Sequence, residues 1–264
     1  MLEEKRTAII LCGGRGTRLG ALSEKIPKAL VSVQKEKILW FIINILRKNK
    51  FNHFILPVGH KGEEIKKFVK KKFKKDKNIE IFTTGLDTSI ASRIFKVKKH
   101  IKSENFLLLN GDAIFNFDLK KIYKNHLKNK IKMTFISFSF QADFGTITVK
   151  NKKILGFQRN FAFNHVKAKN EDKLNAYVYS GISLMNKKLL VQNFKPYKNF
   201  EKELYPRIIK KYNCRVETPQ GFFTSIDTLK DVQKVNSKKA EDSKYLEVKK
   251  IKKLITIFNN KHDR

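Results

Sequence analysis

The chain carries Ala8-Ile9-Ile10-Leu11-Cys12-Gly13-Gly14-Arg15-Gly16-Thr17-Arg18-Leu19 near its start, followed by Ile26-Pro27-Lys28-Ala29-Leu30. The unbroken apolar run over 8–12 is typical of a buried strand in a parallel sheet. Glycines let successive backbone N–H groups approach anionic oxygens, and the arginines add charge and forked donors. The stretch therefore predicts a phosphate-binding loop after a strand. The alternative is a tight turn with incidental arginines.

Two better-known phosphate loops do not fit this stretch. The loop of the P-loop triphosphatases requires Gly, four residues, and then Gly-Lys-Ser/Thr, whereas the dinucleotide fingerprint requires Gly-x-Gly-x-x-Gly. Leu19 occupies the position of the third fingerprint glycine. The loop is thus of a different kind from both.

Apolar strands alternate with helical segments through the first half of the chain. We expect a helix over 35–50, a strand over 54–59, a basic helix over 63–75, and strands over 79–82 and 106–109. This alternation predicts an α/β fold with a Rossmann-like mixed, mainly parallel sheet flanked by helices. Ligands of such sheets bind at the carboxyl ends of strands, where the glycine loop also falls.

Asp112 follows the apolar strand at 106–109 and Asn110-Gly111. An aspartate after a strand is more often a turn former or a helix cap. Beside a phosphate loop it becomes a candidate Mg²⁺ ligand, because Mg²⁺ in phosphoryl chemistry is held by one or two carboxylates together with substrate phosphates. We expect Asp118 to cap a helix over 119–128.

The second half of the chain is less regular. We expect strands over 133–140, 144–149, 154–157 and 176–185, the last interrupted by Ser180-Gly181, and a mobile polar loop over 161–175. Apolar residues recur at helical spacing from 245 to 258. They predict a domain over 1–236 and a basic amphipathic helix within 237–264, packed on this domain or on a second subunit rather than on a membrane.

The net charge of +34 favours anionic partners but names none. The surplus is mainly lysine spread along the chain and accompanies no motif that reads RNA or DNA, so we expect no nucleic-acid partner. The apolar run Ile38–Leu46 is too short to cross a bilayer, and the first residues are unlike a signal peptide. With two cysteines that lack metal spacing, the sequence predicts a cytoplasmic protein.

The run Gly13–Leu19 with Pro27-Lys28 resembles the signature of the sugar-1-phosphate nucleotidyltransferases, and further matches extend over about residues 6–236. The resemblance implies transfer from a nucleoside triphosphate to a sugar 1-phosphate, with release of pyrophosphate, for cell-surface polysaccharide. The segment 83–94 most resembles the glucose-1-phosphate cytidylyltransferase branch, although Ala91-Ser92 stands where that branch usually has two glycines.

CTP and glucose 1-phosphate are accordingly the expected substrates. Guanylyl or uridylyl transfer to another hexose or heptose 1-phosphate is the alternative within the family. A catalytically silent nucleotide-binding module is the alternative of another class. We expect no stable membrane insertion, and a homo-oligomer remains open.

The expected site combines the residues above with those that the resemblance implies. Arg18 and Lys28 are the expected catalytic residues, Asp112 and Asp227 the ligands of an Mg²⁺ cofactor. The nucleotide site is expected to comprise Leu11, Gly13, Gly14, Gly16, Thr17, Arg93 and Gly111, and the sugar-phosphate site Gly145, Arg159, Ser180, Gly181 and Glu201.

The sugar-phosphate half departs from the family pattern at one position. Family members commonly read Phe-x-Glu-Lys-Pro where this chain has Phe157-Gln158-Arg159-Asn160-Phe161, so that Asn160 stands in the place of the lysine. Arg159 and Lys167 are the candidates to supply the missing charge. Glu201 is a candidate for a sugar hydroxyl, or else a solvated acid at a helix start.

Overall fold

A seven-stranded mixed sheet forms the centre of the fold, in the order β16-β8-β15-β6-β1-β4-β5. The computed structural model describes residues 4–74, 76–138, 140–141, 146–150, 153–158, 162–163, 165–168, 171–175, 177–193, 199–237 and 243–262. The strands are β1 (Thr7–Leu11), β4 (His53–Val58), β5 (Ile79–Thr83), β6 (Asn105–Asn110), β8 (Met133–Phe138), β15 (Val178–Asn186) and β16 (Cys214–Glu217). Every pairing in this sheet is parallel except the two made by β15. The predicted fold class is confirmed.

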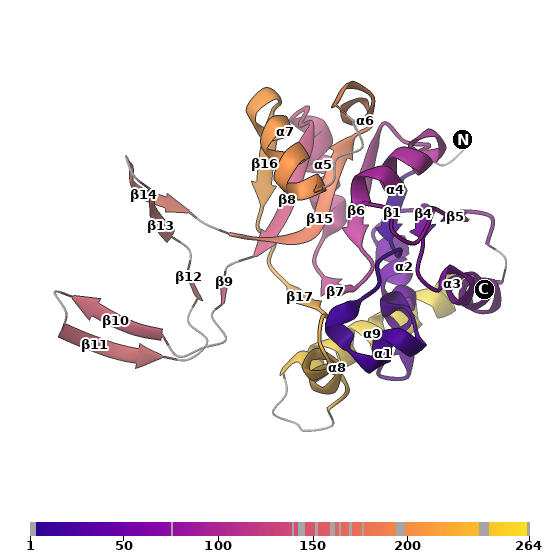
Figure 1. Ribbon diagram of the computed structural model, residues 1–264, viewed down its shortest axis with the longest axis horizontal. Helices are drawn as coiled ribbons and strands as arrows, with labels where there is room; N and C mark the ends of the chain where they lie inside the picture. Colours follow the sequence, from indigo (N-terminus) through magenta and orange to yellow (C-terminus); the bar gives the residue numbers. More distant parts are fainter. Residues whose placement is uncertain are drawn as a thin grey trace.

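Helices connect these strands and lie around the sheet (Figure 1). They are α1 (Ala21–Lys25), α2 (Ile38–Lys48), α3 (Gly62–Lys72), α4 (Ile90–Val97), α5 (Leu119–Lys128), α6 (Lys188–Asn193), the π-helix η4 (Phe200–Leu204), α7 (Tyr205–Lys211), α8 (Leu229–Asn236) and α9 (Ser243–His262), with 3₁₀ turns η1 (Thr17–Leu19), η2 (Lys28–Leu30) and η3 (Lys98–His100). The side chain of Asp118 accepts a hydrogen bond from the backbone N–H of Lys121, 3.0 Å away. Asp118 therefore caps α5 as predicted.

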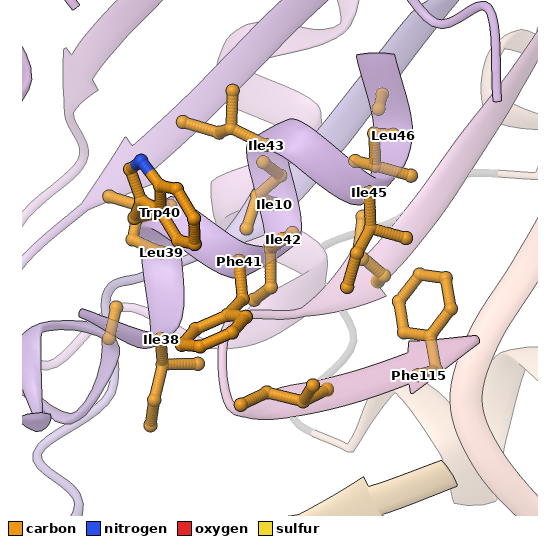
Figure 2. Packing of buried hydrophobic residues seen from close by; sticks show 14 of the residues in the cluster. Ile10, Ile38, Leu39, Trp40, Phe41, Ile42, Ile43, Ile45, Leu46 and Phe115 are labelled. Carbon is orange, nitrogen blue, oxygen red and sulfur yellow. The ribbon is translucent and has the colours of Figure 1, made fainter. Parts of the chain in front are cut away.

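Helix α2 is buried around most of its circumference. Each residue from Ile38 to Leu46 is buried, and Figure 2 shows the apolar ones among them with Ile10 of β1 and Phe115 of β7 (Ala113–Asn116). A helix that is apolar on all sides needs cover on all sides. Helix α2 contacts β7 and α9, and its apolar residues belong to one core cluster with Ile10 and Leu107 of the sheet.

The C-terminal helix α9 is part of the packed core. Val248, Ile251 and Ile255 are buried, whereas Leu246 and Leu254 are exposed. The helix contacts α2 and α8, which agrees with the expectation that it packs on the domain or on a second subunit. The division at residue 236 stays a prediction. No helix among the described residues is long and apolar enough to cross a membrane.

Six short strands between β8 and β15 extend away from the sheet (Figure 1). They pair as β9 (Phe140–Gln141) with β12 (Ala162–Phe163), β10 (Thr146–Lys150) with β11 (Lys153–Gln158), and β13 (His165–Ala168) with β14 (Glu171–Asn175). We call residues 140–175 the arm. The expectation of a loop over 161–175 was thus wrong. The hairpin of β13 and β14 could not be predicted because Val166 and Leu174 are its apolar cross-strand partners, and they leave too little alternation of apolar and polar residues to indicate strands.

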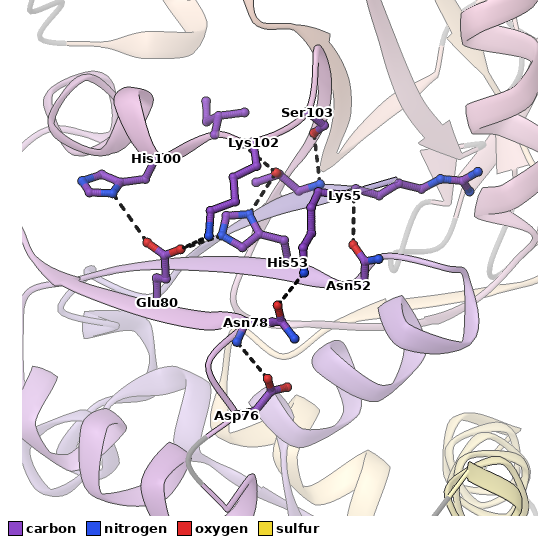
Figure 3. A network of polar contacts seen from close by, with 12 residues as sticks. Lys5, Asn52, His53, Asp76, Asn78, Glu80, His100, Lys102 and Ser103 are labelled. Carbon is purple, nitrogen blue, oxygen red and sulfur yellow. Dashed lines mark hydrogen bonds and ion pairs between the residues drawn. The ribbon is translucent and has the colours of Figure 1, made fainter. Parts of the chain in front are cut away.

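A polar network ties the starts of the central strands together at the edge where these strands begin (Figure 3). His53 is buried, with Nδ1 3.0 Å from Oγ1 of Thr7 and Nε2 2.9 Å from Oε1 of Glu80. Lys102 Nζ donates to the same carboxylate oxygen over 2.6 Å. Burial lowers the pKa of His53. The network joins the neighbouring strands β1, β4 and β5 where they begin, whereas the glycine loop follows the other end of β1.

A second buried histidine, His126 on α5, lies between polar groups of β6 and β8. Its Nδ1 is 2.8 Å from Oγ1 of Thr134 and its Nε2 is 3.1 Å from Oδ1 of Asn105. Because Oδ1 can only accept, Nε2 carries the proton and Nδ1 accepts from the threonine. Burial, with a smaller contribution from Lys132, lowers the pKa of His126 from 6.5 to about 4.

This pKa predicts a loss of stability in acid. Below about pH 6.5 the unfolded chain takes up a proton at His126 and the folded protein does not. The contribution of His126 to the free energy of unfolding is therefore fully present above pH 6.5, and the free energy of unfolding falls by about 3 kcal/mol by pH 4. Urea unfolding at several pH values should show a shallower dependence between pH 7 and 4 for His126→Gln than for the wild type. Parallel profiles for the two proteins would contradict the assignment.

Candidate active site

A cavity of about 450 Å³ opens at the carboxyl ends of β1 and β6. These strands are parallel neighbours, with Leu11 opposite Asn110, and the backbone N–H of Gly111 donates to the carbonyl oxygen of Leu11 over 3.1 Å. The register brings the glycine loop and Asp112 to one corner. The predicted residues that line the cavity are Leu11, Gly13, Gly14, Gly16, Thr17, Arg18, Lys28, Arg93, Gly111 and Asp112.

The shape of the glycine loop depends on two of its glycines. Gly16 has φ of 67°, in the left-handed region that favours glycine, and it directly precedes η1. At Gly13 an added Cβ would collide with the guanidinium of Arg93, whereas at Gly14 it would meet nothing within 4 Å. The absence of a side chain at Gly13 is therefore a packing requirement.

The side chain of Arg93 on α4 holds this loop in place by hydrogen bonds. It is buried, and Nη2 donates to the carbonyl oxygens of Gly13 (3.0 Å) and Leu86 (2.9 Å). Nη1 donates to Oγ1 of Thr84 (2.5 Å) and to the carbonyl oxygen of Val58 (3.3 Å). Burial lowers the pKa of the guanidinium. Arg93 lines the cavity as predicted, but these donors are directed to the protein, so its nucleotide contact stays a prediction.

Asp112 and Asp227 meet although they are far apart in the sequence. Strand β7, directly after Asp112, pairs antiparallel with β17 (Phe222–Ser225), with Ala113 opposite Ser225. The backbone N–H of Ile226 then donates to the carbonyl oxygen of Asp112 over 2.9 Å. This short ladder places the two carboxylates side by side, with Asp112 in the lining of the cavity.

Lys28 bridges the two carboxylates. Its Nζ donates to Oδ2 of Asp112 and to Oδ1 of Asp227, both over 2.6 Å. Nη2 of Arg18 lies 2.8 Å from the same oxygen of Asp227. Burial raises the pKa of the Asp227 carboxyl, but the hydrogen bond and charge of Lys28, the Ser225 hydroxyl and the charge of Arg18 outweigh this effect and hold the pKa below its ordinary value.

The donor set fits a magnesium ion. Two carboxylate oxygens, on Asp112 and Asp227, converge on one point, which the ammonium of Lys28 marks. The described residues contain no cluster of three or more His, Cys, Asp and Glu side chains that would make a cage of protein ligands. Mg²⁺ is typically bound by one or two carboxylates and completed by substrate phosphates and water.

Cys12 lies in the cavity wall beside these charges. Burial, with a smaller effect of the Asp112 charge, raises the pKa of its thiol to about 12. Burial thus favours the neutral thiol over the thiolate at this position.

None of the three expected sugar-phosphate residues that the structure describes lines the cavity. Gly181, with φ of 77°, lies against the side chain of Asn110, which does line it. Ser180 donates to the carbonyl oxygen of Ile136 over 2.7 Å, at a bulge between β15 and β8. Glu201 is exposed on η4. The predictions for Gly145, Arg159 and Asn160 fall outside the described residues.

Several cavity residues were not among those we expected. Leu86, Asp87, Thr88 and Ile90 form the wall opposite the glycine loop, and Nη2 of Arg15 lies 2.8 Å from Oδ1 of Asp87. The likeness of segment 83–94 to the glucose-1-phosphate cytidylyltransferase branch was the available signal for these four residues. The ion pair between Arg15 and Asp87 had no signal in the sequence, because these residues are 72 positions apart and meet only in the folded protein.

Comparison with known proteins agrees with this geometry. Residues 7–237 match the family described as nucleotidyl transferase. The chain is 30% identical over 252 residues to a probable glucose-1-phosphate cytidylyltransferase of Bacillus subtilis, covering 87% of this chain and 94% of the relative. It is 31% identical over 175 residues to the D-glycero-alpha-D-manno-heptose 1-phosphate guanylyltransferase of Campylobacter jejuni, covering 65% and 74%.

A solved structure shows the same fold. The crystal structure of HddC from Yersinia pseudotuberculosis superposes with a TM-score of 0.67 at 18% identity, covering 88% of this chain and 99% of that one. The chain belongs to the nucleotidyl transferase family and is a sugar-1-phosphate nucleotidyltransferase.

The contact between Gly13 and Arg93 gives a prediction about stability. Gly13→Ala should lower the free energy of unfolding by about 1–3 kcal/mol, because the new methyl group displaces a buried guanidinium that four acceptors hold. Gly14→Ala is the matched control and should change it by much less. Thermal and urea unfolding of both variants measure the difference, and equal losses would contradict the packing requirement.

Proposed function

We propose that this nucleotidyltransferase transfers a cytidylyl group from CTP to glucose 1-phosphate and releases pyrophosphate. The likeness to the Bacillus subtilis cytidylyltransferase over nearly its whole length supports this choice. The Campylobacter jejuni relative supports a second candidate, guanylyl transfer to a heptose 1-phosphate. Either product would be an activated sugar for cell-surface polysaccharide, and both triphosphates are cytoplasmic metabolites, which supports that location for the protein.

The observation that carries the proposal is the convergence of Lys28, Asp112 and Asp227 beside the glycine loop. The reaction needs no activated side chain, because the sugar's own phosphate oxygen attacks the α-phosphorus. A new P–O bond forms there, the bond between the α-phosphorus and the bridging oxygen breaks, and pyrophosphate leaves with the electron pair. The neutral thiol of Cys12 agrees with such a mechanism.

Catalysis then consists of placing the reactants in line and neutralising charge. The backbone N–H groups of residues 13–17 would hold the triphosphate, and Arg18, whose side chain is 72% exposed, would reach its outer oxygens. Lys28 would bridge phosphate oxygens in the wall of the cavity. Asp112 and Asp227 would hold Mg²⁺, which supplies a Lewis acid to the α-phosphate when bound.

The proposal predicts measurable turnover. In the presence of Mg²⁺, each of CTP, GTP, UTP and dTTP should be incubated with glucose, mannose, galactose and heptose 1-phosphates, and pyrophosphate release measured. We expect the highest rate for CTP with glucose 1-phosphate. A higher rate for GTP with a heptose phosphate would replace the first choice by the second, and folded protein that is silent across the panel would refute both.

A second prediction tests the carboxylate pair. Asp112→Asn should lower kcat by about two orders of magnitude or more, because it removes one of the two carboxylates that would hold Mg²⁺ at the α-phosphate. Asp118→Asn is the control, since Asp118 only caps α5. Circular dichroism should show both variants folded. Unchanged turnover in Asp112→Asn would remove this residue from the site.

A further inference from the structure

The ammonium of Lys28 and a divalent cation compete for the same carboxylate oxygens. Nζ lies 2.6 Å from Oδ2 of Asp112 and 2.6 Å from Oδ1 of Asp227, and only 16% of the Lys28 side chain is exposed. Arg18 makes a third contact, 2.8 Å from Asp227. The two carboxylates and two cations together carry no net charge, so the pair is already neutralised by side chains of the chain itself.

The backbone at Lys28 is fixed while its side chain can turn. Lys28 begins η2 directly after Pro27, and the next residues, Ala29, Leu30 and Val31, are buried. The position of its Cα is therefore set by core packing. The four-carbon stem of a lysine is flexible by comparison, so a change of side-chain rotamer would move the ammonium off the carboxylates without a change in the fold.

We propose that Lys28 is a tethered counter-ion that keeps Asp112 and Asp227 closed to a free divalent cation in the nucleotide-free protein. This inference rests on the proposed function, in which the two carboxylates hold the metal. A divalent cation that binds both oxygens must displace the ammonium and would leave two unpaired positive side chains beside it. A triphosphate offers these side chains new anionic partners, so the metal binds favourably once the nucleotide is present.

The test measures the binding of Mn²⁺ to the protein without nucleotide, by calorimetry and by the electron paramagnetic resonance signal of the free ion. Lys28→Met should bind Mn²⁺ about tenfold more tightly than the wild type, since a competing cation is gone. Arg18→Met, at a more exposed position, should tighten binding by less. Lys25→Met is the matched control, because Lys25 is an exposed lysine of the neighbouring helix α1, and it should match the wild type.

The outcomes separate this inference from the proposed function. Adding Asp112→Asn to Lys28→Met should abolish the tight site, which locates the ion at the carboxylates. Mn²⁺ binding in folded Lys28→Met that equals or falls below the wild type overturns the counter-ion inference. If Asp112→Asn leaves binding unchanged in both backgrounds, the carboxylate metal site of the proposed function fails instead. Arg18→Met provides the same comparison if Lys28→Met does not fold.

Discussion

The parallel pairing of β1 with β6 is the constraint on which the site depends. With Leu11 opposite Asn110, the chain that leaves each strand enters the same corner, one as a glycine loop and the other as Gly111-Asp112. The ladder of β7 with β17 then adds Asp227. Main-chain hydrogen bonds thus fix the relative positions of the charged groups, and the side chains need only reach one another.

The buried Arg93 and the partly buried Lys28 have different roles beside this corner. Arg93 donates to three carbonyl oxygens and one hydroxyl, all neutral groups that belong to the scaffold. Lys28 is shared by two carboxylates that have a second use in the proposed reaction. The arginine therefore stabilises the shape of the cavity, while the lysine can exchange partners. Most of the net charge of +34 lies elsewhere on the chain.

The residues that line the cavity could be predicted to lie together because most of them are close in sequence to strand ends. Gly13, Lys28 and Asp112 each follow or lie near an apolar run that periodicity detects, and all three line the cavity. The hairpin of β13 with β14 escaped prediction because its apolar pattern is too sparse. The bridge formed by Lys28 could not be predicted for another reason. Asp112 lies 84 positions and Asp227 lies 199 positions along the chain from Lys28. Such a contact depends on tertiary register, which local pattern does not encode.

The arm enters and leaves the sheet at one place, because β8 and β15 are antiparallel neighbours and Phe138 lies opposite Val178. An insertion bounded by two paired residues can lengthen, shorten or change sequence while the order and register of the sheet stay as they are. The glycine loop, Lys28 and both carboxylates all lie outside it. The fold is in this sense modular: the sequence of the arm can change while the corner that holds the glycine loop, Lys28 and the two carboxylates keeps its geometry.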